Sequence, residues 1–282
     1  MVTPPRTAIN QTVLHVLNIV FLVLTLVFNF LVNALPLNGK NTGELSAQYP
    51  NLFTPAALTF SIWIVIYAAL MFFVGWQLIR LRNAQRAYHR DHAVAAIGLK
   101  FVWLCVLNMA WLFCWHYEFL PAGLVVMLIT LGLLIRMNHL IFRMLPHTTD
   151  NRNYLQIPFG LYLGWISVAT VANMAAVLVG TGWDAMGLSE KFWTVLMILV
   201  ATLLAILAVR NWKNIPYALV VCWALTGIII KHRMLFGASL TMVILSAGVC
   251  LLILFIFSYS NFKRWWGSAV STDAYPPGSI RY

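Results

Sequence analysis

Polar and aromatic side chains recur inside apolar stretches of this chain, at the spacing of one helical face. The stretch "WISVATVAN", residues 165–173, carries Trp165, Ser167, Thr170 and Asn173. At 100° per residue, Trp165, Ala169 and Asn173 share a face, whereas the two hydroxyls lie off it and are expected to bond to preceding backbone carbonyls. A small, aromatic, amide-bearing face suits a flat hydrophobic ligand, because rings stack on it and an amide orients a carbonyl or carboxylate.

Two other stretches repeat this pattern. "NMAWLFCW" places an amide and two tryptophans on one stripe, and "TFSIWIVIY" does the same with a hydroxyl and three aromatic rings. Ordinary packing of membrane helices is the alternative explanation, because small residues allow close approach and buried amides bond between helices. The candidate ligand-binding residues on the three stretches are Phe60, Trp63, Tyr67, Asn108, Trp111, Trp115, Trp165, Ala169 and Asn173.

Side chains that would support catalysis are sparse. Every Asp and Glu falls in a loop, in the tail or at the end of an apolar block, so no carboxylate relay crosses the bilayer. The histidines form no deep pair for haem, the cysteines have no C-x-x-C spacing, and common hydrolase and nucleotide motifs are absent. His116 and Glu118 form the one acid–base pair at a membrane edge. We therefore expect no enzyme activity, no metal and no resident cofactor.

The elements that must position these residues are membrane helices. The chain is 62% apolar and 9% charged, and its charges separate apolar blocks long enough to span a bilayer. The expected fold is an all-α polytopic bundle of about eight helices. The seventh is the weakest, and Lys231 is expected to extend it by reaching to the interface. The expected spans are 12–34, 56–79, 94–116, 121–142, 157–180, 192–209, 215–230 and 235–258.

The net charge of +11 reflects topology. Basic residues concentrate at the termini and in the even-numbered loops, most densely in 80–90, which places both termini in the cytoplasm by the positive-inside rule. The expected location is the cytoplasmic membrane of a bacterium. Membrane lipids are expected partners and nucleic acid is not, and a homodimer is left open.

These motifs resemble the TspO/MBR family of tryptophan-rich sensory or translocator proteins. Trp165, Ser167, Ala169, Thr170 and Asn173 match the family's spacing in its fifth helix, and "NMAWLFCW" resembles its third. Pro55, followed by Trp63 and Tyr67, resembles its second. The likeness is weak in the first and fourth helices. The chain departs from the pattern at Ala57, where a tryptophan is usual, at Phe60, one place out of step, in the inserted loop "PHTTDNRNYLQ", and in its three additional helices.

The resemblance implies a five-helix TspO-like bundle over residues 1–182, followed by a three-helix extension and cytoplasmic tail over 183–282. It also implies a sensor or translocator that holds a small hydrophobic ligand, a porphyrin or sterol, in an aromatic cavity. A secondary transporter for a small hydrophobic solute and a membrane enzyme acting on a lipid or pigment remain alternatives. The loop 36–55 is expected to cover the bundle mouth, and the last three helices to pack beside the cavity without entering it.

Overall fold

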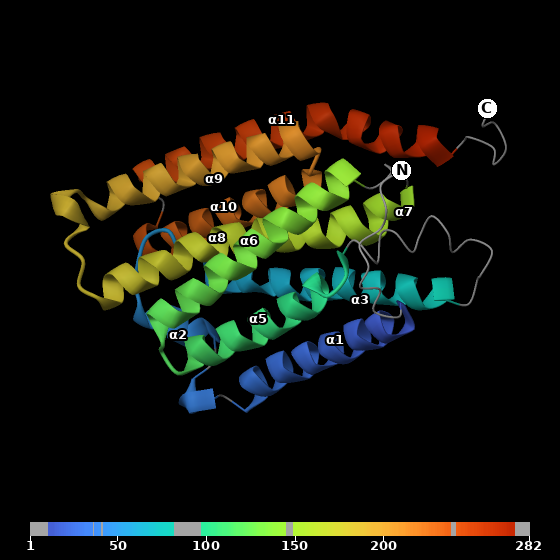
Figure 1. The fold of residues 1–282 in the computed structure, drawn as a ribbon. Coiled ribbons are helices and arrows are strands. Elements are labelled where there is room, and N and C mark those ends of the chain that lie inside the picture. Colours follow the sequence, from blue (N-terminus) through green and yellow to red (C-terminus); the bar gives the residue numbers. More distant parts are fainter. Residues whose placement is uncertain are drawn as a thin grey trace.

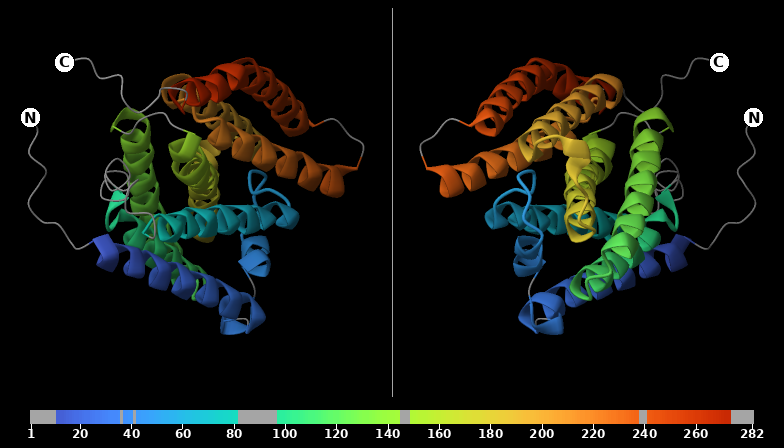
Figure 2. Two further views of the ribbon diagram at one scale, coloured as in Figure 1. Left: turned by 90° about the vertical axis from the view of Figure 1, so that its right-hand side faces the viewer. Right: turned by 90° about the vertical axis from the view of Figure 1, so that its left-hand side faces the viewer.

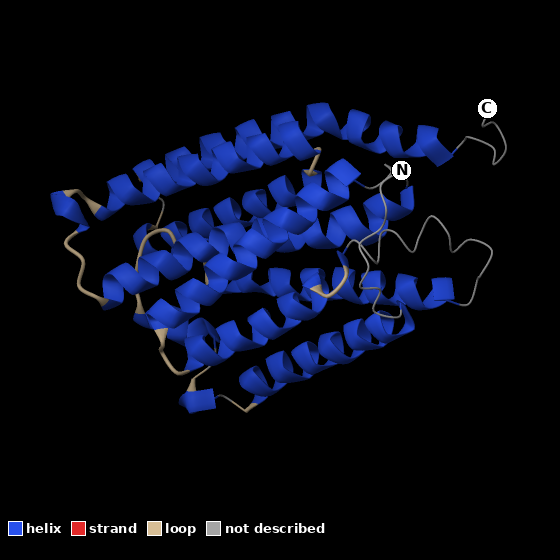
Figure 3. Cartoon of the chain, viewed as in Figure 1, coloured by secondary structure: helices blue, strands red, loops and turns tan. Residues whose placement is uncertain are grey.

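The chain forms a bundle of long helices. The computed structural model describes residues 11–35, 37–40, 42–81, 97–144, 149–237 and 241–273, and within these ranges it contains helices, turns and loops but no strand (Figure 3). Apolar side chains face both the interior and the outer surface of the bundle, as bilayer-embedded helices require. The sequence-based prediction of an all-α polytopic membrane bundle is confirmed.

Eight helices of at least four turns make up the bundle in the described ranges (Figure 1). Seven are long and apolar enough to cross a membrane, while α5, with 17 residues, falls just short. α1 begins and α11 ends at the same end of the bundle (Figure 1). The helices are α1 (Gln11–Ala34), α3 (Ile62–Leu81), α5 (Lys100–His116), α6 (Leu120–Met144), α8 (Ile157–Gly180), α9 (Glu190–Trp212), α10 (Ile215–Phe236) and α11 (Met242–Asp273).

The seventh helix is longer than expected. α10 continues past residue 230 to Phe236 and has 22 residues, so α5 is the shortest of the long helices. Asn214 begins α10 by accepting a hydrogen bond from the backbone N–H of Tyr217, and Pro216 occupies the first turn, where its missing N–H is not needed. The prediction that this helix is the weakest span is wrong, because α10 is long and apolar enough to cross a membrane, whereas α5 is too short.

The helices form three tiers (Figures 1 and 2). α1 packs on α3 and α5 at one side, α8 and α6 lie in the middle with α10, and α9 and α11 cover α10 on the far side. α8 and α10 approach closely at two glycines of α8, since a Cβ at Gly160 would meet Asn214 and one at Gly164 would meet the carbonyl of Tyr217. Division of the chain at residue 182 stays a prediction.

The segment expected as a loop before α8 is largely helical. Residues 145–148 lie outside the described residues, but α7 (Thr149–Asn151) and a π-helical turn, η4 (Arg152–Gln156), lead directly into α8. The N–H of Ile157 donates to the carbonyl of Arg152, five residues back. This wider turn precedes Pro158, whose ring and missing N–H disrupt regular α-helical bonding. Tyr154 in this turn stacks on Trp76, with ring centroids 5.2 Å apart.

Much of the basic surface used to orient the chain lies outside the described residues. Residues 82–96 and both termini belong to this part, and only the backbone of 263–273 is described. Orientation relative to the cytoplasm therefore stays a prediction.

Candidate ligand-binding site

The hydroxyls of Ser167 and Thr170 on α8 donate hydrogen bonds to backbone carbonyls of the same helix. Ser167 donates to the carbonyl of Leu163 at 2.9 Å, and Thr170 donates to that of Ile166 at 2.7 Å. A hydroxyl buried in an apolar bundle would otherwise lack a partner, so this bonding lowers the cost of its burial. The predicted division of α8 into back-bonded hydroxyls and an aromatic, amide-bearing face is confirmed.

The amide of Asn173 joins α8 to α5. Its Oδ1 accepts a hydrogen bond from the indole Nε1–H of Trp111 at 3.1 Å, and its Nδ2 donates to the carbonyl of Ala169 at 3.1 Å. Trp111 and Asn173 are 7% and 5% exposed, so each group finds its partner inside the protein. The contact holds the Trp111 ring in a fixed orientation.

Aromatic rings from α3 and its leading turn meet those of α8. Trp63 stacks on Tyr67 at a centroid distance of 5.2 Å and lies edge-on to Tyr162 and Trp165 at 5.7 and 6.4 Å. Phe60, in the 3-10 turn η2 (Ala57–Ser61), packs edge-on against Trp165 at 5.7 Å. Offset and edge-to-face geometries are the favourable ones for aromatic pairs. Trp63 is therefore the ring that contacts most members of this cluster.

A narrow cavity lies among α3, α5 and α8. Its volume is about 30 Å³, which holds a few water molecules at most. Its inner wall includes most of the residues predicted from sequence, and the loop before α3 closes it with Tyr49, Asn51 and Thr54. The predicted residues that line this cavity are Phe60, Trp63, Trp111, Trp115, Trp165, Ala169 and Asn173.

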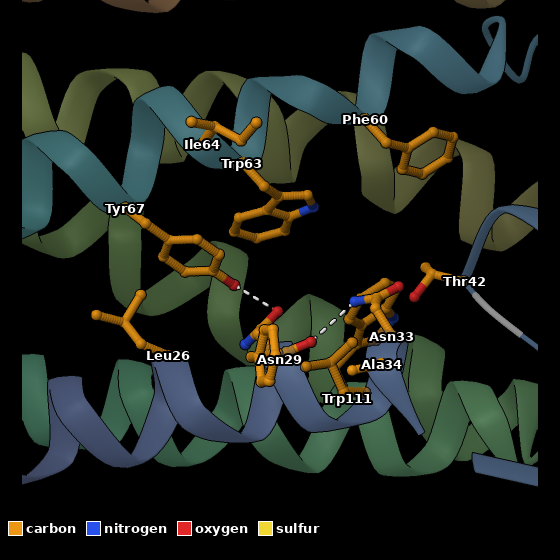
Figure 4. Close-up of a pocket in the computed structure, with 12 residues that line it drawn as sticks. Leu26, Asn29, Asn33, Ala34, Thr42, Phe60, Trp63, Ile64, Tyr67 and Trp111 are labelled. Carbon is orange, nitrogen blue, oxygen red and sulfur yellow. Dashed lines mark hydrogen bonds between the residues drawn. The ribbon is translucent and has the colours of Figure 1, made fainter. Parts of the chain in front are cut away.

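A larger groove adjoins this cavity between α1 and α3 (Figure 4). Its volume is about 540 Å³, within the range of small-molecule sites. Phe60, Trp63 and Trp111 belong to the walls of both spaces. Phe30 and Ile64 on its rim are 70% and 73% exposed, so the groove opens on the apolar outer surface of the bundle.

Sequence reasoning missed the contribution of α1 to this groove. Asn29 accepts a hydrogen bond from the hydroxyl of Tyr67 at 2.8 Å and donates from Nδ2 to Asn108 at 2.9 Å (Figure 4 shows the first). Asn33 also lines the groove and donates to the carbonyl of Asn29. The signal was present, since Asn29 and Asn33 are polar residues one turn apart in an apolar block, but α1 carries no tryptophan.

Asn108 occupies a different place from the other candidates. It is 5% exposed, lines neither the cavity nor the groove, and bonds to Asn29, Tyr67 and Tyr162. Tyr67 lines the groove but not the cavity. Ala57, where the TspO pattern has a tryptophan, is exposed and lines neither space.

The loop between α1 and α3 folds over the end of the bundle, as predicted. It contains η1 (Leu37–Gly39) and the short helix α2 (Thr42–Gln48), whose Leu45 is completely buried. Thr42 accepts a hydrogen bond from the indole of Trp115 through its backbone carbonyl. Lys40 and Tyr49 both bond to the carboxylate of Glu118, at 3.1 and 2.8 Å.

Glu118 has unusual electrostatics as a result. The hydrogen bond from Tyr49, with that from Lys40, holds the pKa of the Glu118 carboxyl below its ordinary value. Burial and the adjacent Glu118 raise the pKa of the Tyr49 hydroxyl. The ring of His116 faces its own helix, since its Nδ1 lies 2.9 Å from the carbonyl of Leu112. Within the described residues, no hydrogen bond joins His116 to Glu118.

A model of the TSPO-like protein family matches residues 15–260. The chain belongs to this family. The matched region reaches well beyond residue 182, so it includes α9, α10 and most of α11 together with the aromatic site. No curated protein and no solved structure matches the chain. Membership in the TSPO-like family agrees with the apolar helices in placing the protein in a membrane as an integral component.

Proposed function

We propose that this TSPO-like protein binds a flat, hydrophobic ligand of the tetrapyrrole or sterol class and acts as a membrane sensor or translocator for it. The observation that carries the proposal is the position of Trp63, whose ring belongs to the wall of both the narrow cavity and the open groove. A ligand in the groove would contact Trp63, Phe60 and Trp111 at once. Flat ring systems gain most from such surfaces.

Polar groups in the groove suit a ligand with one or two oxygen atoms. The indole N–H of Trp63 has no hydrogen-bond partner among the described residues, and Figure 4 shows its nitrogen turned toward the groove. This donor is available for a carbonyl, carboxylate or hydroxyl oxygen. Asn33, across the groove on α1, supplies a second polar group. Few polar groups in a mainly apolar pocket are typical of sites that orient a hydrophobic ligand.

Ligand binding is tested by titration of the purified protein with protoporphyrin IX and, separately, with cholesterol. We expect saturable quenching of tryptophan fluorescence by the porphyrin, and Trp63→Leu should reduce affinity about three- to twelvefold, the worth of one aromatic partner. Trp193→Leu is the control, since Trp193 lies outside both spaces and donates to the carbonyl of Ala185. Absence of saturable binding of either compound would contradict the proposal.

Sensing and translocation are separated by a flux measurement. Proteoliposomes containing the protein are loaded with porphyrin, and its appearance outside is followed over time. Movement that depends on Trp63 indicates translocation, whereas saturable binding without movement indicates sensing.

A further inference from the structure

Side chains of α10 form hydrogen bonds to the loop that closes the aromatic cavity. The ammonium of Lys231 donates hydrogen bonds to the backbone carbonyls of Asn51 and Thr54, each at 2.9 Å. The Nε2 of His232 lies 3.1 Å from the carbonyl of Leu52. The sequence-based expectation that Lys231 reaches to the membrane interface stays a prediction, and the contacts of its ammonium are with the loop before α3. Its charge is satisfied by backbone carbonyls of the loop, which are good acceptors for an ammonium.

α9 also contributes a side chain that holds this loop segment. Glu190, in the first turn of α9, accepts a hydrogen bond from the backbone N–H of Leu52 at 2.7 Å. The loop segment 51–54 is thus held between a cationic and an anionic side chain, both from the C-terminal helices. Hydrogen bonds to charged groups are stronger than those between neutral groups.

Two further bonds tie the following residues to α10. The N–H of Ala56 donates to the carbonyl of Gly227 at 3.0 Å, and the indole of Trp223 donates to the carbonyl of Thr59 at 2.9 Å. Gly227 is required by this contact, because a Cβ there would collide with the side chains of Thr59 and Pro55. The loop therefore rests directly on the backbone of α10.

The segment held by Lys231 and Glu190 also closes the cavity, and we call the loop residues 49–55 its roof. Tyr49, Asn51, Thr54 and Pro55 line the narrow cavity, and the Asn51 side chain accepts hydrogen bonds from the backbone N–H groups of Phe53 and Thr54 and from the Thr54 hydroxyl. This internal bonding makes residues 51–54 a compact turn. Because the turn is bonded internally, a change in the contacts of Lys231 or Glu190 should move all of residues 51–54 together.

We propose that Lys231 and Glu190 are positioning residues that hold the roof closed, and that α9 and α10 thereby control access to the aromatic cavity from the bundle mouth. The C-terminal helices act on the site without lining it, since no residue of α9, α10 or α11 belongs to the described walls of the cavity or the groove. The positioning role is independent of any ligand, whereas control of access rests on the proposed function.

Hydrogen–deuterium exchange of the full-length protein in detergent tests the positioning role. Lys231→Met keeps the apolar stem and removes the donors, and we expect exchange of the peptide 49–57 to rise about tenfold or more. Lys231→Arg should restore protection, because its guanidinium also donates to two carbonyls. The matched control is Lys191→Met, which removes the same charge from an exposed position one residue beyond Glu190.

Two further variants separate hydrogen bonding from charge. Glu190→Gln keeps an acceptor for Leu52 and should preserve most of the protection, whereas Glu190→Leu should lose it. Protection of α6 should stay unchanged in every variant, which shows that the bundle remains folded. Unchanged exchange of 49–57 in Lys231→Met, or an equal rise in Lys191→Met, would overturn the positioning role.

Access is tested by stopped-flow binding of protoporphyrin IX. The closed cavity holds only a few water molecules, so a porphyrin can reach its walls from the bundle mouth only when the roof opens. Loss of these hydrogen bonds should therefore raise the association and dissociation rates together, with a much smaller change in affinity, because it opens this path and alters no wall residue. Unchanged rates in a variant whose roof does exchange faster would contradict control of access. If Lys231→Met exposes the roof and no porphyrin binds to any variant, the positioning role stands and the proposed function fails.

Discussion

Trp111 and Asn173 form a hydrogen bond of 3.1 Å between α5 and α8, at the wall of the narrow cavity. The other end of the Asn173 amide donates to the carbonyl of Ala169. Both ends of the amide thus have partners inside the protein before any ligand arrives. Asn173 is placed to fix the Trp111 ring, so under the proposed function a ligand would gain from the ring's orientation more than from the amide itself.

Replacement of Asn173 by Leu should therefore reduce stability as well as binding. The change leaves the buried Trp111 N–H without its acceptor, and we expect the free energy of unfolding to fall by about 1 kcal/mol, above the average of about 0.6 kcal/mol for interhelical bonds in membranes. Denaturation in mixed micelles provides the measurement. Asn33→Leu is the control for stability, because Asn33 is exposed and donates only within α1. Equal losses in both variants would contradict a special role for the pair.

Trp165 should affect affinity and stability together. It is 2% exposed and meets the rings of Phe60 and Trp63 edge-on. Trp165→Leu removes one stacking partner from the cavity wall, so we expect porphyrin affinity to fall about three- to twelvefold, with a lower unfolding temperature. Fluorescence titration and thermal unfolding measure the two effects. The half-buried Trp212 lies outside both spaces, and Trp212→Leu should leave affinity unchanged.

Helical periodicity was sufficient to predict the aromatic face of α8 and its partners on α3 and α5. The reason is local: a residue's direction around a helix follows from its position, so Trp165, Ala169 and Asn173 necessarily share a face. The back-bonding of Ser167 and Thr170 was predictable for the same reason, since the acceptor is a carbonyl one turn earlier.

Contacts between distant segments were not predictable in this way. Lys231 and its acceptors Asn51 and Thr54 are separated by most of the chain, and only the folded arrangement of α10 beside the loop brings them together. From sequence, a lysine at the end of an apolar block indicates a membrane interface. The groove was missed on similar grounds: Asn29 and Asn33 mark a polar face of α1, but the volume of the groove depends on how α1 rests against α3, which the sequence does not give.

Gly227 should tolerate no side chain. A Cβ at this position would collide with Thr59 and Pro55, so Gly227→Ala must displace the roof or α10, and we expect a loss of about 1–3 kcal/mol, the usual cost of overpacking. Thermal unfolding in detergent measures it. Gly132→Ala is the matched control: nothing lies within 4 Å of a Cβ there, and alanine favours a helix, so this variant should be neutral or slightly stabilised. A neutral Gly227→Ala would show that the roof contact is looser than described.

The attachment of the loop between α1 and α3 to Glu118 should weaken in acid. The hydrogen bonds from Tyr49 and Lys40 lower the pKa of Glu118 in the folded protein, so its contribution is present above the unfolded value of about 4.3 and is lost as pH falls through the lowered value. The raised pKa of Tyr49 acts in the opposite direction. Its contribution to the stability of the attachment is present below about pH 10 and is lost as pH rises through the folded pKa. Attachment should therefore be strongest between about pH 5 and 9.

Exchange of the peptide 37–49 over a pH series, corrected for the intrinsic pH dependence of exchange, measures this attachment. We expect protection to be flat near neutral pH and to fall below about pH 4. Glu118→Gln should abolish the acid transition, because the amide does not titrate, while leaving a weaker bond from Tyr49. Glu44→Gln is the control, since Glu44 is an exposed carboxylate on the same loop. An acid transition that persists in Glu118→Gln would assign the effect to another group.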